Sequence, residues 1–244
     1  MVILQSYLLK KFSNIKFGMS TKVGKQKEAP YYFNLSKSVG DNEKVVEANR
    51  KEFFEKFLLA PRSVKLQKQI HSDIITYVDK NSEVPESDAL ITDKPQIGLA
   101  AITADCPTIF LYDNVKKVIG AVHSGWRGTE KRILAKTVTK MITDFKSEPS
   151  NMYAYIAPSI SQNFYEVGNE VAEKFDKRFL IKVYQHNFLD LKKCNLTMLV
   201  TLGVPYKNIQ VSELCSFELK HLFHSYRRDG EKSGRSLGMI MMKD

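Results

Sequence analysis

The chain has 244 residues, of which 43% are hydrophobic and 26% are charged. This length suits one large α/β or α+β domain, and with only 12 Gly and 8 Pro the composition excludes a collagen-like, low-complexity or disordered chain. The net charge of +10 raises the question of a nucleic-acid partner, but it is spread as +5 over residues 1–60, +2 over 61–150 and +3 over 151–244. Lysines mixed with acids in this way are typical of a solvated surface, so we do not expect a nucleic-acid partner.

Three cysteines and five histidines limit the redox and metal chemistry of the chain. The cysteines are far apart and form no CxxC pair, so no disulfide framework is expected and the predicted location is the reducing cytoplasm. One blue-copper centre alone uses two His and one Cys, and a trinuclear copper cluster beside it needs more ligands than remain. A multicopper oxidase therefore cannot be built from this chain alone.

Apolar patterns predict the helices and strands in chain order. The apolar start is broken by Gln5 and Ser6 and lacks a preceding basic residue, which predicts a strand and no targeting segment. Since no run of 18 apolar residues occurs, no membrane-spanning helix is expected. The predicted elements are a strand at 1–9, a helix at 41–59 capped by Asp41 or Asn42, strands at 74–78, 97–103, 108–112 and 117–123, a helix from Thr129 to Phe145, a strand at 153–156, helices at 167–179 and 188–202, and a strand at 208–212.

A predicted β-hairpin in the middle of the chain brings a cysteine and a histidine together. If a turn at 113–116 pairs Tyr112 with Lys117, the antiparallel register places Cys106 opposite His123. Opposed residues have Cβ atoms about 4.5 to 5.5 Å apart. A thiolate and an imidazole at this separation are able to bind one metal ion.

His71 is available as a third ligand. Two His and one Cys leave a fourth tetrahedral position open, a pattern typical of catalytic zinc. Two other interpretations use the same residues. Cys106 and the histidines are either ordinary core and strand-end residues, or Cys106 is the nucleophile and His123 the base of a Cys–His hydrolase.

Polar and basic residues accompany these ligands along the chain. Asp105 directly precedes the predicted cysteine ligand and is the nearest carboxylate able to shuttle protons. Arg127 lies between a predicted strand and a helix N-terminus, where free amides and a guanidinium bind anions. Near the C-terminus, Arg227, Arg228 and Arg235 suit a phosphate or a sugar, although arginines in such a loop are often only solvated.

Motifs over nearly the whole chain recur, in the same order, in a known family. They are Phe33-Asn34-Leu-Ser36, Gln69-Ile-His71, Thr103-Ala-Asp105-Cys106-Pro107, Ala121-Val-His123-Ser-Gly-Trp-Arg127-Gly128, Ala157-Pro-Ser-Ile160 with Tyr165-Glu-Val-Gly168, and Phe223 to Asp229 with Gly234-Arg235. These residues resemble the laccase-domain family, long labelled multicopper polyphenol oxidoreductases and now described as purine nucleoside phosphorylases.

The resemblance implies a zinc site at His71, Cys106 and His123, with copper as a possible metal but no multicopper cluster. It implies phosphorolysis of adenosine, inosine, guanosine and methylthioadenosine, with adenosine deamination as a second activity. It also implies one α+β domain over residues 1–244, with layered mixed β-sheets flanked by helices, similar to the catalytic domain of cytotoxic necrotizing toxins. Alternatives are a Cys–His hydrolase, a peptidoglycan-precursor editing factor, a copper-dependent polyphenol oxidoreductase and a nucleic-acid-binding module.

For catalysis the expected residues are the three metal ligands and Asp105. Arg127, Arg227, Lys22 and Asn34 are the expected contacts to substrate and phosphate. Lys22 stands where the family usually has an arginine, so it keeps the charge but loses bidentate anion binding. The expected partners are purine nucleosides and phosphate, without a membrane.

Overall fold

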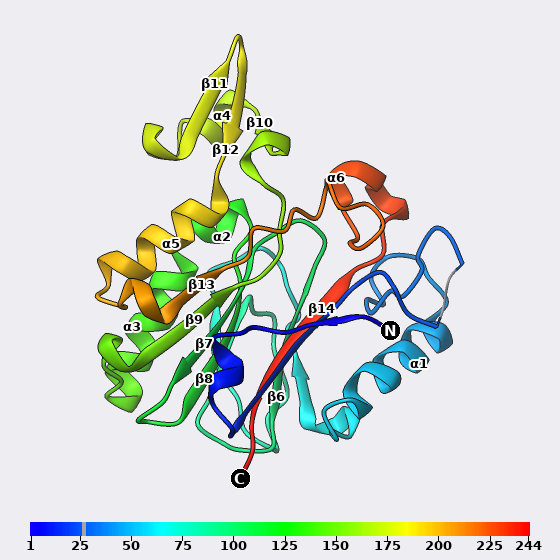
Figure 1. Cartoon of the computed structure of the whole chain (residues 1–244), viewed down its shortest axis with the longest axis vertical. Coiled ribbons are helices and arrows are strands. Elements are labelled where there is room, and N and C mark those ends of the chain that lie inside the picture. Colours follow the sequence, from blue (N-terminus) through cyan, green and yellow to red (C-terminus); the bar gives the residue numbers. More distant parts are fainter. Residues whose placement is uncertain (26–27) are drawn as a thin grey trace.

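The computed structural model describes residues 1–25 and 28–244. It has an α+β fold in which two large β-sheets and one small sheet are flanked by helices (Figure 1). The predicted fold class is therefore confirmed, whereas the likeness to the toxin domain stays a prediction. Most expected strands lie within one or two residues of their predicted positions.

Two of the sheets contain both parallel and antiparallel neighbours. One has the order β1 (Ile3–Leu4), β2 (Ile15–Ser20), β14 (Ser236–Met242), β6 (Gly98–Thr103) and β3 (Val64–Leu66), with β3 and β6 parallel. The other has the order β13 (Ile209–Val211), β9 (Met152–Ile156), β7 (Thr108–Asp113), β8 (Val118–His123), β5 (Ala89–Thr92) and β4 (Ile75–Tyr77). The small antiparallel sheet has the order β10 (Glu166–Val167), β12 (His186–Leu189) and β11 (Leu180–Val183).

The two large sheets pack face to face and each is covered on its outer face by helices. Between them lies an aromatic core in which Phe17 of β2 contacts Phe110 of β7 and Tyr155 of β9, with ring centroids 4.9 and 5.1 Å apart. Helix α1 (Glu43–Glu55) covers the five-stranded sheet, and α3 (Ile133–Phe145) and α5 (Leu191–Thr201) cover the six-stranded sheet (Figure 1). Both faces of each sheet are thereby removed from water.

Helix caps explain where the longer helices begin. The side chain of Asn42 accepts a hydrogen bond from the backbone N–H of Lys44, which confirms the cap predicted for α1. Thr129 was predicted to start a helix and does not, because α2 (Trp126–Glu130) already contains it and Arg132, with φ 62°, separates α2 from α3. Among the described residues, no helix has the length and apolar character that crossing a bilayer requires.

The predicted helix at 167–179 is wrong. This region contains β10, the single turn of α4 (Asn169–Ala172) and a 3₁₀ turn. The expected helix at 188–202 begins only at Leu191, because the residues before it form β12. The small sheet projects from one end of the molecule (Figure 1), and its own apolar cluster around Phe179 and Leu189 produced the spacing that suggested a helix.

The predicted hairpin register is also wrong, by two residues. Asp113 pairs with Val118, so Thr108 and not Cys106 lies opposite His123. The reason is the side chain of Asp113, which accepts hydrogen bonds from the N–H groups of the next turn residues and moves the turn to 114–117. A shift of two residues keeps every side chain on its predicted face.

Candidate metal centre and substrate pocket

Three potential metal ligands converge at one end of the two large sheets. His71 lies in the loop after β3, Cys106 lies between β6 and β7, and His123 is the last residue of β8. Their ligand atoms all lie within 4.8 Å of one another, and the two imidazole rings are 5.0 Å apart in a T-shaped arrangement. His123 is buried and His71 is exposed, so the group is open to solvent on the side of His71. The structure therefore brings together the three predicted ligands.

A buried carboxylate, Asp88, orients both histidines. Its Oδ1 accepts a hydrogen bond from the backbone N–H of His71 at 3.1 Å and lies 2.9 Å from Nδ1 of His123. Its Oδ2 accepts from the N–H and hydroxyl groups of Ser72. The contacts hold His71 at its positive φ of 58° and leave Nε2 of His123 free to bind a metal.

The charges of this group are strongly coupled. Burial alone raises the pKa of Asp88, but hydrogen bonds from His123 and Ser72 outweigh it and hold the pKa at about 2. Burial likewise raises the pKa of the Cys106 thiol, yet the charge of His123 and hydrogen bonds from both histidines lower it to about 6. The same attraction, together with Asp88, raises the pKa of His123 to about 9. Without a metal, the stable form is a thiolate beside an imidazolium.

The donor set and the space around it fit a metal ion. One thiolate and two imidazoles are ligands that zinc prefers, and they also suit copper. Gly125 closes one side of the group. A Cβ atom at this position would lie 3.0 Å from Sγ of Cys106 and 3.3 Å from Cδ2 of His71. A larger residue here would crowd the ligands, so the glycine keeps room for the ion.

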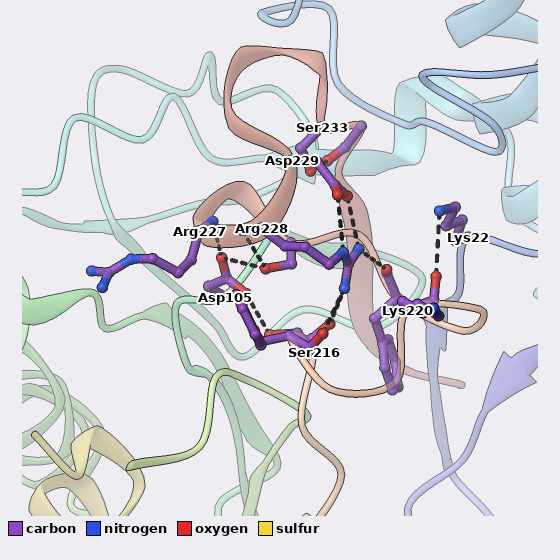
Figure 2. A network of polar contacts seen from close by, with 12 residues as sticks. Lys22, Asp105, Ser216, Lys220, Arg227, Arg228, Asp229 and Ser233 are labelled. Atoms are coloured by element: carbon purple, nitrogen blue, oxygen red, sulfur yellow. Dashed lines mark hydrogen bonds and ion pairs between the residues drawn. The ribbon is translucent and has the colours of Figure 1, made fainter. Parts of the chain in front are cut away.

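Asp105 takes part in a polar network with residues near the C-terminus (Figure 2). Its carboxylate accepts hydrogen bonds from the hydroxyls of Ser216 and Ser225 at 2.6 and 3.0 Å and from the backbone N–H of Arg227 at 2.7 Å. These hydrogen bonds compensate for the strained backbone of Asp105, whose φ is 98°. The structure thus gives this carboxylate the task of fixing the backbone next to Cys106.

Arg228 completes the same network. Its guanidinium donates to the carbonyl oxygens of Ser216, Phe217 and Phe223 and forms an ion pair with Asp229 (Figure 2). We call residues 216–229 together with the Asp105 and Arg228 contacts the C-terminal latch. This segment contains α6 (Tyr226–Asp229), and its hydrogen bonds to Asp105 hold it against the loop that contains Cys106.

A pocket of about 710 Å³ opens beside the three ligands. Its lining contains several cationic side chains and Glu86 as its acid. Two of the cationic residues, Arg50 of α1 and Arg235, are half-buried. Arg235 directly precedes β14, and its guanidinium lies 5.3 Å from the ring of Tyr226. The lining includes the metal ligands His71, Cys106 and His123, together with Arg50, Arg235 and Tyr226.

The predicted anion-binding arginines lie outside the lining of this pocket. Arg127 is exposed and its guanidinium stacks 4.2 Å from the ring of Trp126. Arg227 is exposed as well, donates to the carbonyl of Glu166, and lies 5.1 Å from the ring of Tyr165. Burial raises the pKa of Tyr165, and the positive charges of Arg127 and Arg227 oppose this increase.

The two remaining predicted contacts are held by structural hydrogen bonds. Asn34 is fully buried, donates to the carbonyl of Ser36 and to Asp41, and accepts from the N–H groups of Ser36 and Arg235. Lys22 lies 4.0 Å from the ring of Tyr32 and donates to a carbonyl of the latch (Figure 2). Burial lowers the pKa of Lys22.

Two functional residues were missed by the sequence reasoning. Asp88 carried one signal, because a carboxylate directly before the fully buried strand β5 needs a partner. Arg50 carries no such signal in the sequence. Its place in the wall of the pocket depends on how α1 packs on the sheet, which the local sequence does not record.

The two-sheet fold and the open His–Cys–His group define the class to which the chain belongs. A family model described as multi-copper polyphenol oxidoreductase laccase matches residues 16–243. The chain therefore belongs to this laccase-domain family.

Individual relatives of the chain are named purine nucleoside phosphorylase. A protein of Clostridium acetobutylicum with this name is 39% identical over 75% of this chain and 78% of its own length. Another, of Bacteroides thetaiotaomicron, is 32% identical over 96% of this chain and 94% of its own length. Among solved structures, YlmD of Geobacillus stearothermophilus is similar with a TM-score of 0.91 and 28% identity, covering 98% of this chain and 94% of that chain.

Proposed function

We propose that the chain is a purine nucleoside phosphorylase with a zinc ion at His71, Cys106 and His123. The observation that carries the proposal is the open His–Cys–His group in the wall of a cationic pocket of about 710 Å³. A pocket of this size is adequate for a nucleoside and a phosphate ion. The names of the relatives support purine nucleosides as substrates, and we extend them to adenosine, inosine, guanosine and methylthioadenosine.

In the proposed reaction, an oxygen of phosphate forms a bond to C1′ of the ribose. The bond from C1′ to N9 of the purine breaks, its electron pair remains on the purine, and a proton reaches a purine nitrogen. The products are ribose 1-phosphate and the free base. Since no covalent bond to the protein forms, catalysis rests on orienting the two reactants and stabilising charge.

Each residue of the site has its own role in the proposed reaction. A bound zinc ion would supply positive charge and an open coordination position. Asp88 holds the two histidines, and Asp105 holds the backbone beside Cys106. Arg127 and Arg227 lie near the site and attract anionic substrate towards it. Lys22 and Asn34 act through the segments that they fix.

Adenosine deamination is proposed as a second activity of the same pocket. In this reaction water adds at C6 of the purine and ammonia leaves, so the products are inosine and ammonia. We place both reactions in the cytoplasm, where purine nucleosides and phosphate occur together.

The test is turnover of adenosine and inosine by the purified protein, with and without phosphate and a chelator, with the products separated by chromatography. We expect phosphate-dependent release of the free base that the chelator abolishes. The variant Cys106→Ala should lose both bound zinc and turnover, and full turnover in this variant would contradict the proposal.

A Cys–His hydrolase is the second candidate, because the pKa of Cys106 is lowered to about 6 beside His123. It predicts an activity that survives chelation and is lost when the metal-free thiol is alkylated. A phosphorylase predicts the opposite response to chelation.

A further inference from the structure

Two arginines in the wall of the pocket have not been given a role. We infer that Arg50 and Arg235 form the subsite that binds inorganic phosphate, in the same pocket that the three metal ligands line. This inference rests on the proposed function, because phosphate is the second substrate of a phosphorylase. It assigns phosphate to residues other than Arg127 and Arg227, which sequence patterns favoured.

A short backbone segment brings the two arginines to the same pocket. Arg50 of α1 donates its Nε to the carbonyl of Leu35 at 2.8 Å. The N–H of Leu35 donates to the carbonyl of Arg235 at 3.1 Å, and the side chain of Asn34 accepts from the N–H of Arg235 at 2.9 Å. Asn34 is anchored in turn by Asn49, whose amide donates to its carbonyl. The buried Asn34–Leu35 segment therefore fixes both arginines relative to each other.

Both guanidinium groups keep donors available for an anion. In the described part of the chain, Arg50 uses only its Nε, and Arg235 uses only Nη1, which donates to the carbonyls of Ser233 and Gly234. Neither arginine forms a salt bridge with a carboxylate among the described residues. A half-buried guanidinium held in place with free N–H groups is well suited to bidentate binding of phosphate.

The other cations near the site fit this task less well. Lys37 of the same pocket is already paired with Glu47 and Glu43. Lys68, which also lines the pocket, is an exposed lysine without the bidentate geometry of a guanidinium. Arg127 and Arg227 are exposed and are not part of the pocket lining, and Arg227 already donates to the carbonyl of Glu166. A phosphate on Arg50 and Arg235 would share one cavity of about 710 Å³ with the metal ligands, which leaves room for a nucleoside beside it.

The test compares the variants Arg50→Lys and Arg235→Lys with the wild-type holoenzyme. Lysine keeps the positive charge but loses the bidentate geometry. We expect the KM for phosphate to rise about tenfold or more in each variant, with little change in the KM for inosine and in zinc content. Arg178→Lys, at an exposed arginine that is paired with Asp176 and does not line the pocket, is the matched control and should leave the KM for phosphate unchanged. Arg127→Gln and Arg227→Gln remove only a longer-range attraction, so the KM for phosphate should rise less in them than in the lysine variants.

Direct titration of the wild type and variants with inorganic phosphate, without nucleoside, separates this inference from the proposed function. If the wild type binds phosphate but shows no turnover, and both lysine variants lose this binding, the proposed phosphorylase function is wrong and the phosphate subsite is confirmed. Phosphorolysis with an unchanged KM for phosphate in both lysine variants, or a raised KM in Arg127→Gln or Arg227→Gln alone, overturns the subsite. Should Arg50→Lys not fold, Arg235→Lys decides the question.

Discussion

At the scale of single residues, the candidate metal centre depends on Asp88 as much as on its ligands. This carboxylate contacts the backbone of His71 and the imidazole of His123, although it binds no metal itself. It determines which nitrogen of His123 is left for the ion, because Nδ1 is already hydrogen-bonded. Without these contacts, the ring of His123 would lose its fixed orientation and the backbone N–H of His71 would lose its acceptor.

The variant Asp88→Asn tests this role. The amide keeps one acceptor but loses the charge and replaces the other oxygen by a donor, so at least one of the contacts to His71, Ser72 and His123 breaks. We expect zinc affinity to fall by about 10- to 100-fold, measured by competition with a chromophoric chelator. Glu86→Gln, an exposed acid of the same loop region, should leave the affinity unchanged. Equal affinity in Asp88→Asn and wild type would exclude the proposed orienting role.

The depressed pKa of Asp88 also predicts how stability depends on pH. Because the folded protein holds this pKa at about 2 instead of its ordinary 3.8, the carboxylate stabilises the fold fully above pH 3.8 and loses that contribution as the pH falls towards 2. The contribution is about 2 kcal/mol. Denaturant unfolding of the metal-free protein should therefore give a wild-type advantage over Asp88→Asn that shrinks by this amount between pH 5 and pH 2. If the difference in the free energy of unfolding between wild type and Asp88→Asn does not change with pH, the lowered pKa of Asp88 is contradicted.

The chemistry of the three ligands could be predicted from the sequence, but their geometry could not. By residue type, Cys106 and the two histidines suit a metal site, but they suit core packing or a Cys–His hydrolase pair as well, and the resemblance to the laccase-domain family selected the metal site. The predicted register placed Cys106 opposite His123, whereas Asp113 shifts the turn and moves this pairing to Thr108. The site is still assembled because the shift preserves the face of the strand. Arg50 and Asp88 depend on contacts distant in sequence, which no local pattern records.

At the scale of secondary-structure elements, the buried strands were the most predictable part. Continuous β-branched and apolar runs such as β7 and β8 are buried on both faces and leave little freedom of interpretation. The small sheet was the least predictable, since two short strands and a single helical turn can share the spacing of one amphipathic helix. The break between α2 and α3 depends on the left-handed backbone of Arg132, a residue that does not usually signal a helix end.

The variant Arg228→Gln tests the contribution of the C-terminal latch to stability. Arg228→Gln removes the donors to three carbonyl oxygens and the ion pair with Asp229. We expect a loss of about 2 kcal/mol or more in the free energy of unfolding, together with faster hydrogen exchange of the amides in 216–229. The KM for nucleoside should rise, because Tyr226 in this segment lines the pocket.

A matched control for the latch is Arg178→Gln. Arg178 forms an ion pair with Asp176, but both side chains are more than half exposed, at 61% and 56%. Its loss should change stability by less than about 0.5 kcal/mol and leave exchange in 216–229 unaltered. Equal effects of the two variants would mean that the latch contacts contribute no more than a surface ion pair.

At the scale of the whole molecule, the ligands connect the two large sheets. His71 follows a strand of the five-stranded sheet, His123 ends a strand of the six-stranded sheet, and Cys106 lies in the crossing between them. A metal bound by all three is therefore a link between the two layers. Zinc should stabilise the whole fold and not only the loops.

Thermal unfolding tests this link. At a zinc concentration about 100 times Kd, the stabilisation is about 2.7 kcal/mol, which corresponds to a rise in Tm of about 5 to 10 °C for a chain of this size. His71→Ala should abolish the rise. His186→Ala, which removes an exposed histidine of the small sheet, should keep it. A zinc-induced rise that persists in His71→Ala would place the stabilising ion elsewhere.

The position of Cys106 in the crossing between the two sheets also makes the metal a reporter of the order of folding. Each sheet alone carries too few ligands to hold the ion, since the set is complete only when β3 and β6 of one sheet lie against β7 and β8 of the other. Zinc uptake during refolding therefore measures the arrival of the assembled tertiary structure, separately from the appearance of the strands themselves. Uptake of the ion thus marks the moment at which the three ligand segments, and with them the two sheets, come together.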